Sequence, residues 1–423
     1  MNSKPIRALY SFPNKLGAAR ICYTAWQQVN GLATAGADLL VFPASTCRPV
    51  PRSVTLRPTL ARGKMRLPFK TIGNMRAHLL HDYIVAHRVE QLAGQIDIIH
   101  AWPSGARRTL QVAAKLDIPT VLERCSAHTR YAYDVVRRES QRLGVTLRKG
   151  DDGAFNKEVL QLEEEEFRLA DRLLCPSDFV VQTFLNEGFP LSRLPRHIYG
   201  IDQKLYYPAP DYRANAGGLR MLFVGYCAVG KGLHYALDAW MRSPAHRNGT
   251  FTIAGEFMPD YARKLAPMLS HPSIRVLGHR NDVPELMRNS DALVLPSLQE
   301  GFGLVCTEAM SSGCVPLVSN ACTDFCKHME NSLVHGMGDV DALAEHISLL
   351  DEDRSLLQEL RLAGLSLRES LTWDAAGIRL LDVYRETIGL HSKNKRGMNT
   401  FAASAEHLGA SVETAVQEGS VTT

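Results

Sequence analysis

Short apolar runs alternate with longer stretches of helical periodicity through the first half of the chain. One such stretch stops at Gly36 after placing apolar side chains at helical spacing, at Ile21, Ala25, Val29 and Leu32. Buried runs separated by helices are typical of a parallel sheet with helices on both faces. We therefore expect an α/β domain whose strands are Ile6–Tyr10, Leu39–Phe42, Ile96–Ile99, Ile118–Leu122 and Leu173–Cys175.

The same pattern restarts after a polar, glycine-rich segment, residues 208–218. Because 423 residues exceed what one hydrophobic core normally supports, we predict two open α/β domains, 1–207 and 208–370. In such domains the loops that follow the strands share one edge of the sheet, where ligands bind. An amphipathic helix is expected over 371–390, and a disordered tail over 391–423. The strands expected in the second domain are Leu219–Gly225, Phe251–Ala254, Ile274–Leu277, Ala292–Leu295 and Val315–Ser319.

Several classes of protein are disfavoured by what the sequence lacks. No apolar run approaches the roughly 18 to 20 residues that cross a bilayer, and the sequence begins without a secretory h-region, so we expect a cytoplasmic protein. The closest cysteines, Cys322 and Cys326, have no second Cys or His pair at zinc spacing. We therefore predict reduced cysteines and no metal site. The acidic run Glu163–Glu166 is interpreted as a solvated helix face.

Positive charge is concentrated in one segment of the first domain. No acid occurs between Ala44 and His81, while arginines and lysines recur through residues 48–76. The segment is consistent with a solvated surface arm. Its charge would also attract a pyrophosphate-linked acceptor or an anionic membrane, which predicts peripheral contact with the inner face of the membrane. Nucleic acid is not expected, because aromatic residues are almost absent and no binding motif accompanies the charge.

Two glutamates flank a glycine-rich turn between a predicted strand and a predicted helix of the second domain. Gly301 and Gly303 leave the backbone free to approach a ligand, and the N–H groups at the start of the helix favour a diphosphate. Carboxylates beside a phosphate site are best explained if they bind uncharged hydroxyl groups of the same ligand. Glu308 would accept the hydroxyls of a ribose, and Glu300 those of a donor sugar. Either glutamate alone is consistent with a solvated acid, but the Glu-x7-Glu spacing is far more specific.

At these residues the chain resembles the retaining glycosyltransferases of the GT-B fold, family 4. Those enzymes carry Pro-Ser-x-x-Glu-Gly-Phe-Gly followed by Glu-Ala-Met/Leu-Ala-x-Gly, and the stretch 296–313 fills all the diagnostic positions. The resemblance is strong over 171–384 and weaker before it. It implies two Rossmann-like domains that face each other across a cleft, and a last helix, 371–390, that returns to the first domain. It also implies a nucleotide-sugar donor, a UDP- or GDP-sugar, in contact with Phe302 and Leu304 as well as with the two glutamates.

The stretch 222–240 resembles the second donor-binding motif of the same family. Gly225 follows its strand, and Lys231, at the start of its helix, is the natural cation for the donor diphosphate as the phosphate leaves. Members of the family commonly carry a second cation in this motif, whereas those positions here hold Tyr226 and Gly230. Without a substitute, the missing cation would weaken transition-state stabilisation by about 2.7 to 4 kcal/mol.

The resemblance also implies contacts from loops that follow other strands. Gly17 stands where the family has a glycine loop against the donor phosphates, and Gly278 and Arg280 stand near the nucleobase, where Arg280 could compensate for the missing cation. Glu123 and His128 follow a strand of the first domain and are predicted to contact the donor sugar or the acceptor. The predicted catalytic residues are Lys231, Glu300, His128 and Glu123, and the predicted donor-binding residues are Gly17, Gly225, Lys231, Gly278, Arg280, Glu300, Gly301, Phe302, Gly303, Leu304 and Glu308.

We therefore expect a retaining hexosyltransferase that needs neither a cofactor nor a metal ion. It would transfer a sugar from a nucleotide-sugar donor to a glycan, lipid-linked or small-molecule acceptor, in bacterial polysaccharide or glycoconjugate synthesis. The alternative is a GT-B protein that has lost turnover with the second cation and acts as a nucleotide-sugar-binding partner subunit. A phosphorylase with the same fold would need a cofactor lysine that nothing in the sequence marks.

Overall fold

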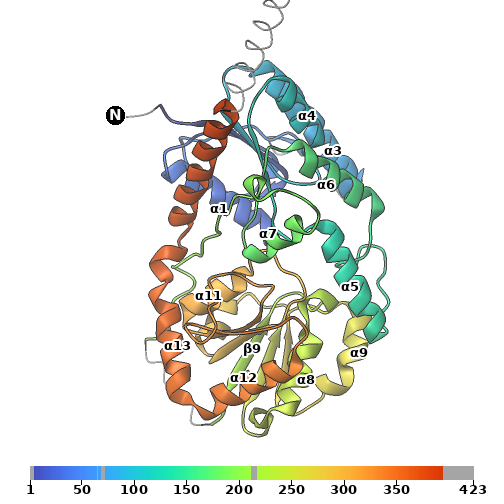
Figure 1. The fold of residues 1–423 in the computed structure, drawn as a ribbon, viewed down its shortest axis with the longest axis vertical. Helices are drawn as coiled ribbons and strands as arrows, with labels where there is room; N and C mark the ends of the chain where they lie inside the picture. The colour runs from blue at the N-terminus through green and yellow to red at the C-terminus, as the bar shows by residue number, and fades with distance from the viewer. Residues whose placement is uncertain (1–3, 64, 68–71, 211–216, 394–423) are drawn as a thin grey trace, which may run out of the picture.

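Two parallel sheets, each covered by helices, form two domains that lie one above the other in Figure 1. The strands of both sheets pair in parallel with their neighbours, which confirms the predicted fold class. Two predicted segments fall partly outside the described residues: the tail from residue 394 onward, and residues 211–216 of the glycine-rich segment. The computed structural model describes residues 4–63, 65–67, 72–210 and 217–393.

The first sheet has the strand order β3-β2-β1-β6-β7-β8. Alternate residues of its central strand enter different hydrophobic clusters: Leu9 packs on one face, and Ala8 and Tyr10 pack on the other. Both faces are therefore buried, which explains the continuous apolar runs. The strands are β1 (Arg7–Leu16), β2 (Asp38–Thr46), β3 (Thr55–Leu56), β6 (Ile98–Ala101), β7 (Thr120–Glu123) and β8 (Arg172–Leu174), and the helices are α1 (Ile21–Thr34), α3 (Asn74–Gln91), α4 (Arg107–Lys115), α5 (Thr129–Leu143), α6 (Lys157–Leu169) and α7 (Asp178–Leu185).

The second sheet repeats this arrangement with the order β11-β10-β9-β12-β13-β14. None of the helices in the described part of the chain is both long and apolar enough to cross a membrane. The strands are β9 (Arg220–Val224), β10 (Thr250–Ala254), β11 (Ile274–Gly278), β12 (Ala292–Leu295), β13 (Val315–Ser319) and β14 (Leu333–His335), and the helices are α8 (Leu233–Arg242), α9 (Pro259–Leu269), α10 (Val283–Arg288), α11 (Leu304–Ser312), α12 (Val340–Glu352) and α13 (Arg354–Ser366).

In each sheet the chain adds its first strands on one side of the domain's first strand and its later strands on the other side. The order changes between β1 and β6 in the first sheet, and between β9 and β12 in the second. Loops diverge at such a switch point and leave a crevice outside the carboxyl ends of the strands. The loops after β1 and β9 are therefore the places where each domain can hold a ligand.

Two helical segments cross from one domain to the other. Helix α5 begins in the first domain and runs down beside α9 (Figure 1), and its Val136 lies in the hydrophobic core of the second domain. Glu139 of α5 also binds His234 Nε2 at 2.8 Å. In the opposite direction, helix 373–393 returns to the first domain, where Tyr384 contacts His100 Nδ1 at 2.7 Å. The domains are thus joined by packed helices as well as by the segment after residue 200.

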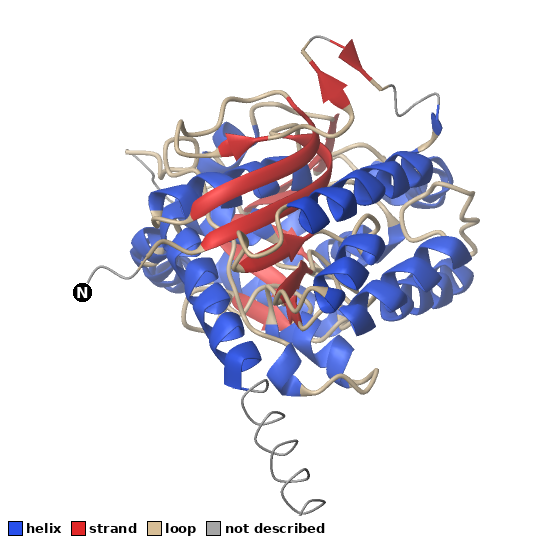
Figure 2. Ribbon diagram, turned by 90° about the horizontal axis from the view of Figure 1, so that it is seen from above, coloured by secondary structure: helices blue, strands red, loops and turns tan. Residues whose placement is uncertain are grey.

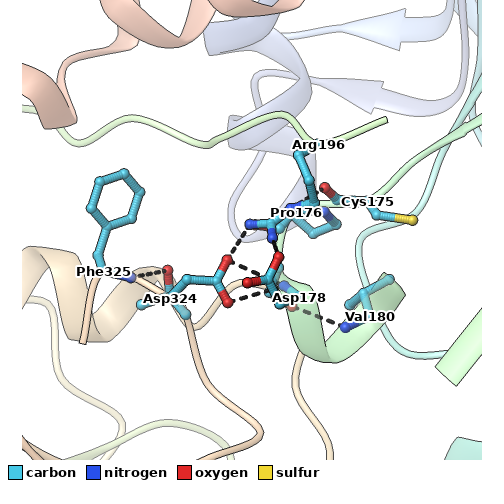
Figure 3. A network of polar contacts seen from close by, with 9 residues as sticks. Cys175, Pro176, Asp178, Val180, Arg196, Asp324 and Phe325 are labelled. Carbon is cyan, nitrogen blue, oxygen red and sulfur yellow. Dashed lines mark hydrogen bonds and ion pairs between the residues drawn. The ribbon is translucent and has the colours of Figure 1, made fainter. Parts of the chain in front are cut away.

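A charged contact also joins the domains beside α7. Figure 3 shows the guanidinium of Arg196, in the first domain, between Asp178 and the second-domain residue Asp324. Asp324 accepts the backbone N–H of Asp178 at 3.0 Å, at the N-terminus of α7. The carboxylate is favoured there because the helix dipole and the unpaired N–H groups carry partial positive charge.

The interpretation of Glu163–Glu166 as a solvated helix face is wrong. Glu166 is fully buried, and its carboxylate accepts the backbone N–H groups of Ser104, Ala106 and Arg107 at 2.7 to 3.2 Å. It therefore satisfies the N-terminus of α4, whose own N-cap residue, Ala106, has no side-chain oxygen to do so.

A small antiparallel hairpin projects from the first domain (Figure 2). It consists of β4 (Ala61–Arg62) and β5 (Met65–Arg66), within the basic segment. The side chain of Met65 is 74% exposed. Lys64 and Lys70 of the basic segment lie outside the described residues.

Candidate functional site

A cleft of about 660 Å³ lies where the switch points of the two sheets face each other. It is lined by loops that follow β1, β2 and β7 in the first domain and β9 and β12 in the second. Its volume falls within the range of about 300 to 1,000 Å³ that is usual for small-molecule sites. The predicted residues that line it are Gly225, Lys231, Glu300, Phe302, Gly303, Leu304 and Glu308.

The loop after β12 is held close to the first domain. A Cβ atom at Gly301 would lie 1.9 Å from the backbone oxygen of Cys125, so only glycine permits this approach between the domains. Gly303 has φ +70° and forms the N-cap of α11, a conformation that L side chains rarely adopt. The two glycines therefore place the N-terminus of α11 at the cleft, where its N–H groups favour an anion.

Lys231 and Glu300 meet in an ion pair, with Nζ 2.5 Å from Oε2. Burial lowers the pKa of Lys231, but the charge and hydrogen bond of Glu300 more than offset that effect and raise it, so the amine stays protonated. Gly232, next to the lysine, has φ +68°, and a Cβ there would lie 2.0 Å from the backbone oxygen of Pro296. The loop after β9 thus packs directly against the loop after β12.

Glu308 lies within α11 and lines the same cleft. Burial raises its pKa to about 7, although a hydrogen bond from the Tyr206 phenol acts in the opposite direction. A carboxylate that is poorly solvated gains most from new hydrogen-bond donors, because water does not already satisfy it. Glu308 is therefore suited to accept hydroxyl groups of a neutral ligand.

Two arginines that the sequence motifs did not mark line the first-domain wall of the cleft. Arg20 precedes α1, and Arg48 follows β2. Arg48 Nε donates to the backbone oxygen of Gly17 at 2.8 Å. Gly17 has φ +83°, and a Cβ there would lie 2.8 Å from the Arg48 side chain. Gly17 therefore adjoins the cleft and makes room for Arg48; only the charge of the basic segment could have indicated this arginine.

Glu123 lies behind the cleft wall. Its fully buried carboxylate accepts hydrogen bonds from Tyr199 at 2.8 Å and Gln28 at 2.9 Å, and it lies 2.9 Å from His197 Nε2 and 3.4 Å from His100 Nε2. Burial raises the pKa of Glu123, but the two histidines more than offset this and hold it well below its usual range. Since Tyr199 lines the cleft, Glu123 can act on a ligand only by holding that ring in place.

His128 does not line the cleft either. It is the N-cap residue of α5, and its Nδ1 accepts the backbone N–H of Arg130 at 3.3 Å. The rings of Phe167, Phe184 and Phe189 surround it. Burial and the neighbouring arginines lower its pKa to about 3, so the imidazole is neutral. In this conformation the predicted contact of His128 with a ligand is not made.

Gly278 and Arg280 are likewise not among the residues that line the cleft. Gly278 ends β11, and Arg280 is exposed beyond it. The guanidinium of Arg280 is paired with Asp282, with Nε 2.8 Å from the carboxylate. Arg280 therefore does not supply the second cation in this conformation.

Comparison with known proteins finds a family likeness in the second domain. Residues 218–353 match the family model of glycosyl transferases group 1. A glycogen synthase of Mycobacterium tuberculosis is 30% identical over 250 residues, which are 55% of this chain and 58% of that enzyme. A D-inositol 3-phosphate glycosyltransferase of Paenarthrobacter aurescens is 25% identical over 390 residues, 84% of this chain and 90% of that enzyme. The chain thus spans little more than half the length of the glycogen synthase.

Solved structures extend the likeness to both domains. A sucrose-phosphate synthase from Thermosynechococcus elongatus has a TM-score of 0.67 and 17% identity, and the match covers 92% of this chain and 100% of that one. Anabaena Alr3699/HepE, solved in complex with UDP, has a TM-score of 0.61 and 18% identity over 90% of this chain and 100% of its own. At such identities the likeness concerns the fold, and it confirms the GT-B arrangement of two Rossmann-like domains.

The raised pKa of Glu308 predicts a specific dependence of stability on pH. The carboxyl is protonated in the folded protein up to about pH 7 but only to about pH 4.5 in the unfolded chain, so the folded state loses stability as the pH rises through this window. Glu308→Gln keeps the hydrogen bond to Tyr206 without the charge. Its melting temperature, followed by circular dichroism, should exceed that of the wild type at pH 8 but not at pH 4.5.

The exposed Glu330 provides a matched control. Glu330→Gln should change the melting temperature equally at both pH values. The same uniform behaviour in Glu308→Gln would show that Glu308 is ionised and well solvated, which contradicts its assignment as a poorly solvated acceptor.

Proposed function

We propose that this chain transfers a sugar from a nucleotide-sugar donor to a glycan or lipid-linked acceptor. The chain has the GT-B fold, and its second domain matches the family model of glycosyl transferases group 1. The observation that carries this proposal is the placement of Lys231, Glu300 and Glu308 in one cleft between the domains. A cation, a helix N-terminus and two hydroxyl acceptors are what a sugar nucleotide requires. The UDP complex of Anabaena Alr3699/HepE supports a nucleotide donor for this fold.

Each part of such a donor has a partner in the cleft. The diphosphate lies at the N-terminus of α11 and beside Lys231, where both the N–H groups and the ammonium attract it. The ribose hydroxyls donate to Glu308. The sugar hydroxyls donate to Glu300, whose carboxylate shares Lys231 with the phosphate. The positions of the two glutamates, before and within the same turn-and-helix unit, set the spacing between sugar and ribose.

The transfer proceeds with retention at the anomeric carbon. The bond from that carbon to the leaving phosphate oxygen breaks, and the electron pair stays on the diphosphate. An acceptor hydroxyl attacks from the same face, its oxygen forms the new glycosidic bond, and its proton passes to the leaving phosphate oxygen. Lys231 and the N–H groups of α11 stabilise the charge that grows on the diphosphate, an effect of about 2.7 to 4 kcal/mol for one well-placed donor.

This chemistry uses no carboxylate nucleophile and no metal ion. The acids of the cleft have other roles in this proposal, since Glu300 is paired with Lys231 and Glu308 accepts the ribose hydroxyls. Glu123 and His128 then have positioning and structural roles, because neither lines the cleft. The second candidate is a nucleotide-sugar-binding subunit without turnover, and it is favoured by Tyr226 and Gly230 at the positions of the usual second cation.

The proposal predicts that one nucleotide stabilises the protein through Glu308. Purified protein is screened by thermal shift with UDP, GDP, ADP and their common sugars, because a ligand of the folded state raises the melting temperature. We expect a shift with one base, and its loss in Glu308→Ala. Release of that nucleotide from its sugar, measured in the presence of EDTA, should continue at the same rate.

The possible outcomes separate the two candidates. No shift with any nucleotide overturns both of them. A shift without release of the nucleotide, in the presence of glycan and lipid-linked acceptors, favours the binding subunit.

We also propose that the protein lies at the inner face of an anionic membrane, which it contacts through the projecting hairpin and helix α3. The hairpin presents Met65 between Arg62 and Arg66, and α3 presents Leu80 and Tyr83, which are 40% and 58% exposed. Arginines would contact the negatively charged lipid headgroups, and the apolar side chains among them would contact the acyl chains beneath. A lipid-linked acceptor would be reached from the same side.

The membrane contact predicts binding to anionic vesicles. The protein should sediment with vesicles of phosphatidylglycerol and phosphatidylcholine, and remain in solution with phosphatidylcholine alone. Arg62→Glu with Arg66→Glu should reduce the bound fraction more than about tenfold, because each basic residue contributes about 1 kcal/mol at such a surface. The exposed Arg275 of the second domain serves as the control, since Arg275→Glu should change nothing. Equal loss in both variants would contradict the assigned surface.

A further inference from the structure

The second-domain wall of the cleft carries little net positive charge for a site that would hold a diphosphate. Lys231 is neutralised by Glu300 at 2.5 Å. Asp152, on the segment that follows α5, acts on Lys231 through its charge, and Asp151 and Asp152 both act on Tyr226. A diphosphate placed against this wall meets one cation, Lys231, which it has to share with Glu300. Further positive charge therefore has to come from elsewhere.

The first-domain wall supplies that charge. Arg20 and Arg48 both line the cleft, and within the described residues neither forms an ion pair with an acid. Burial and the acids Asp151 and Asp152 raise the pKa of Tyr226, and the charge of Arg20 opposes them. Arg20 and Tyr226 line the same cleft, and Tyr226 occupies one of the positions where related enzymes carry their second cation.

The guanidinium of Arg48 is held in place before any ligand arrives. Its Nε donates to the backbone oxygen of Gly17 at 2.8 Å, and its Cζ lies 5.2 Å from the ring centre of Tyr23 and 5.5 Å from that of Trp26. The indole of Trp26 is itself fixed by a 2.8 Å hydrogen bond to the backbone oxygen of Pro49. Because Nε makes this contact, the two terminal nitrogens of the guanidinium are left as hydrogen-bond donors. A guanidinium that is already held by stacking loses little conformational freedom when it binds phosphate.

Arg20 has an unusual backbone conformation for a residue at the start of a helix. Its φ and ψ are 60° and −135°, at the N-cap position of α1, in a region that residues other than glycine rarely occupy. No side-chain cap accompanies this geometry. A strained residue at the mouth of a cleft is a sign that its side chain is retained for function, since glycine would fit the backbone better.

We propose that Arg20 and Arg48 provide, from the first domain, the second cation for the donor diphosphate. This rests on the proposed function, and it replaces the role that Tyr226 and Gly230 leave vacant. Because Lys231 belongs to the other domain, the phosphate is enclosed by positive charge only when both walls contact it. Stabilisation of the leaving diphosphate is therefore linked to the approach of the two domains, and both arginines contact the ligand as it leaves.

The test separates phosphate binding from nucleoside binding. Wild type, Arg20→Gln and Arg48→Gln are titrated calorimetrically with UDP, GDP and ADP, and with uridine, guanosine and adenosine. We expect each substitution to weaken binding of the recognised diphosphate about tenfold or more, the effect of a hydrogen bond to a charged group, with the affinity for its nucleoside unchanged. Arg52→Gln, an equal change of charge on an exposed arginine away from the cleft, should leave both affinities unchanged.

A further variant separates function from folding. Arg20→Gly relieves the backbone strain, so its melting temperature should equal or exceed that of the wild type, while its affinity for the diphosphate falls as in Arg20→Gln. Unchanged diphosphate affinity in Arg20→Gly and Arg48→Gln, in a protein that binds the nucleotide, overturns this inference alone. A wild type that binds none of the three diphosphates overturns the proposed function instead.

Discussion

The ion pair between Lys231 and Glu300 is the interaction on which the rest of the cleft depends. It joins the loops after β9 and β12, the two strands on either side of the switch point of the second sheet. Gly232 lets these loops touch, because any side chain there would meet the backbone of Pro296. In the proposed reaction, a diphosphate would share Lys231 with Glu300, which would free part of the carboxylate to accept a sugar hydroxyl. The same ion pair therefore joins the two loops and holds the two groups that the proposed function assigns to the phosphate and the sugar.

The packing between domains determines which charges can reach that pair. Gly301 brings the loop after β12 against the backbone of Cys125, and the contact of Arg196 with Asp324 holds the domains together beside α7 (Figure 3). Helix α5 extends the first domain along the second. With the domains joined in this way, Arg48 faces a cleft whose other wall, around Lys231, belongs to the second domain.

Residues positioned within one strand-turn-helix unit could be predicted from the sequence, and residues positioned by long-range packing could not. Glu300, Glu308 and Lys231 occur in the same cleft because each follows a central strand of one sheet, a relation that the local pattern already carries. His128 also follows a strand at the expected edge, but the pattern does not say which way a side chain turns there, and aromatic rings bury it. Arg48 reaches the cleft through its bond to Gly17, 31 residues earlier, which no motif records.

The acidic run of α6 illustrates the same limit in the core. Charge alone predicted a solvated face, yet Glu166 is buried because it accepts the backbone N–H of Ala106, 60 residues away, at the start of α4. The first N–H groups of a helix need hydrogen-bond acceptors from outside the helix. Which acid provides them depends on how the helices pack. The fold class and the placement of Lys231, Glu300 and Glu308 in one cleft could thus be predicted from the sequence pattern, whereas the first-domain wall required the structure.

The most direct measurement of the central claim is a crystal structure of the protein with the nucleoside diphosphate that it binds. The account predicts ribose hydroxyls within hydrogen-bond distance of the Glu308 carboxylate, and a phosphate that contacts Lys231 and the N–H groups at the start of α11. It predicts the nucleotide in the cleft between the two sheets. A nucleotide bound elsewhere, or one in the cleft whose phosphates avoid Lys231 and whose ribose avoids Glu308, would contradict it.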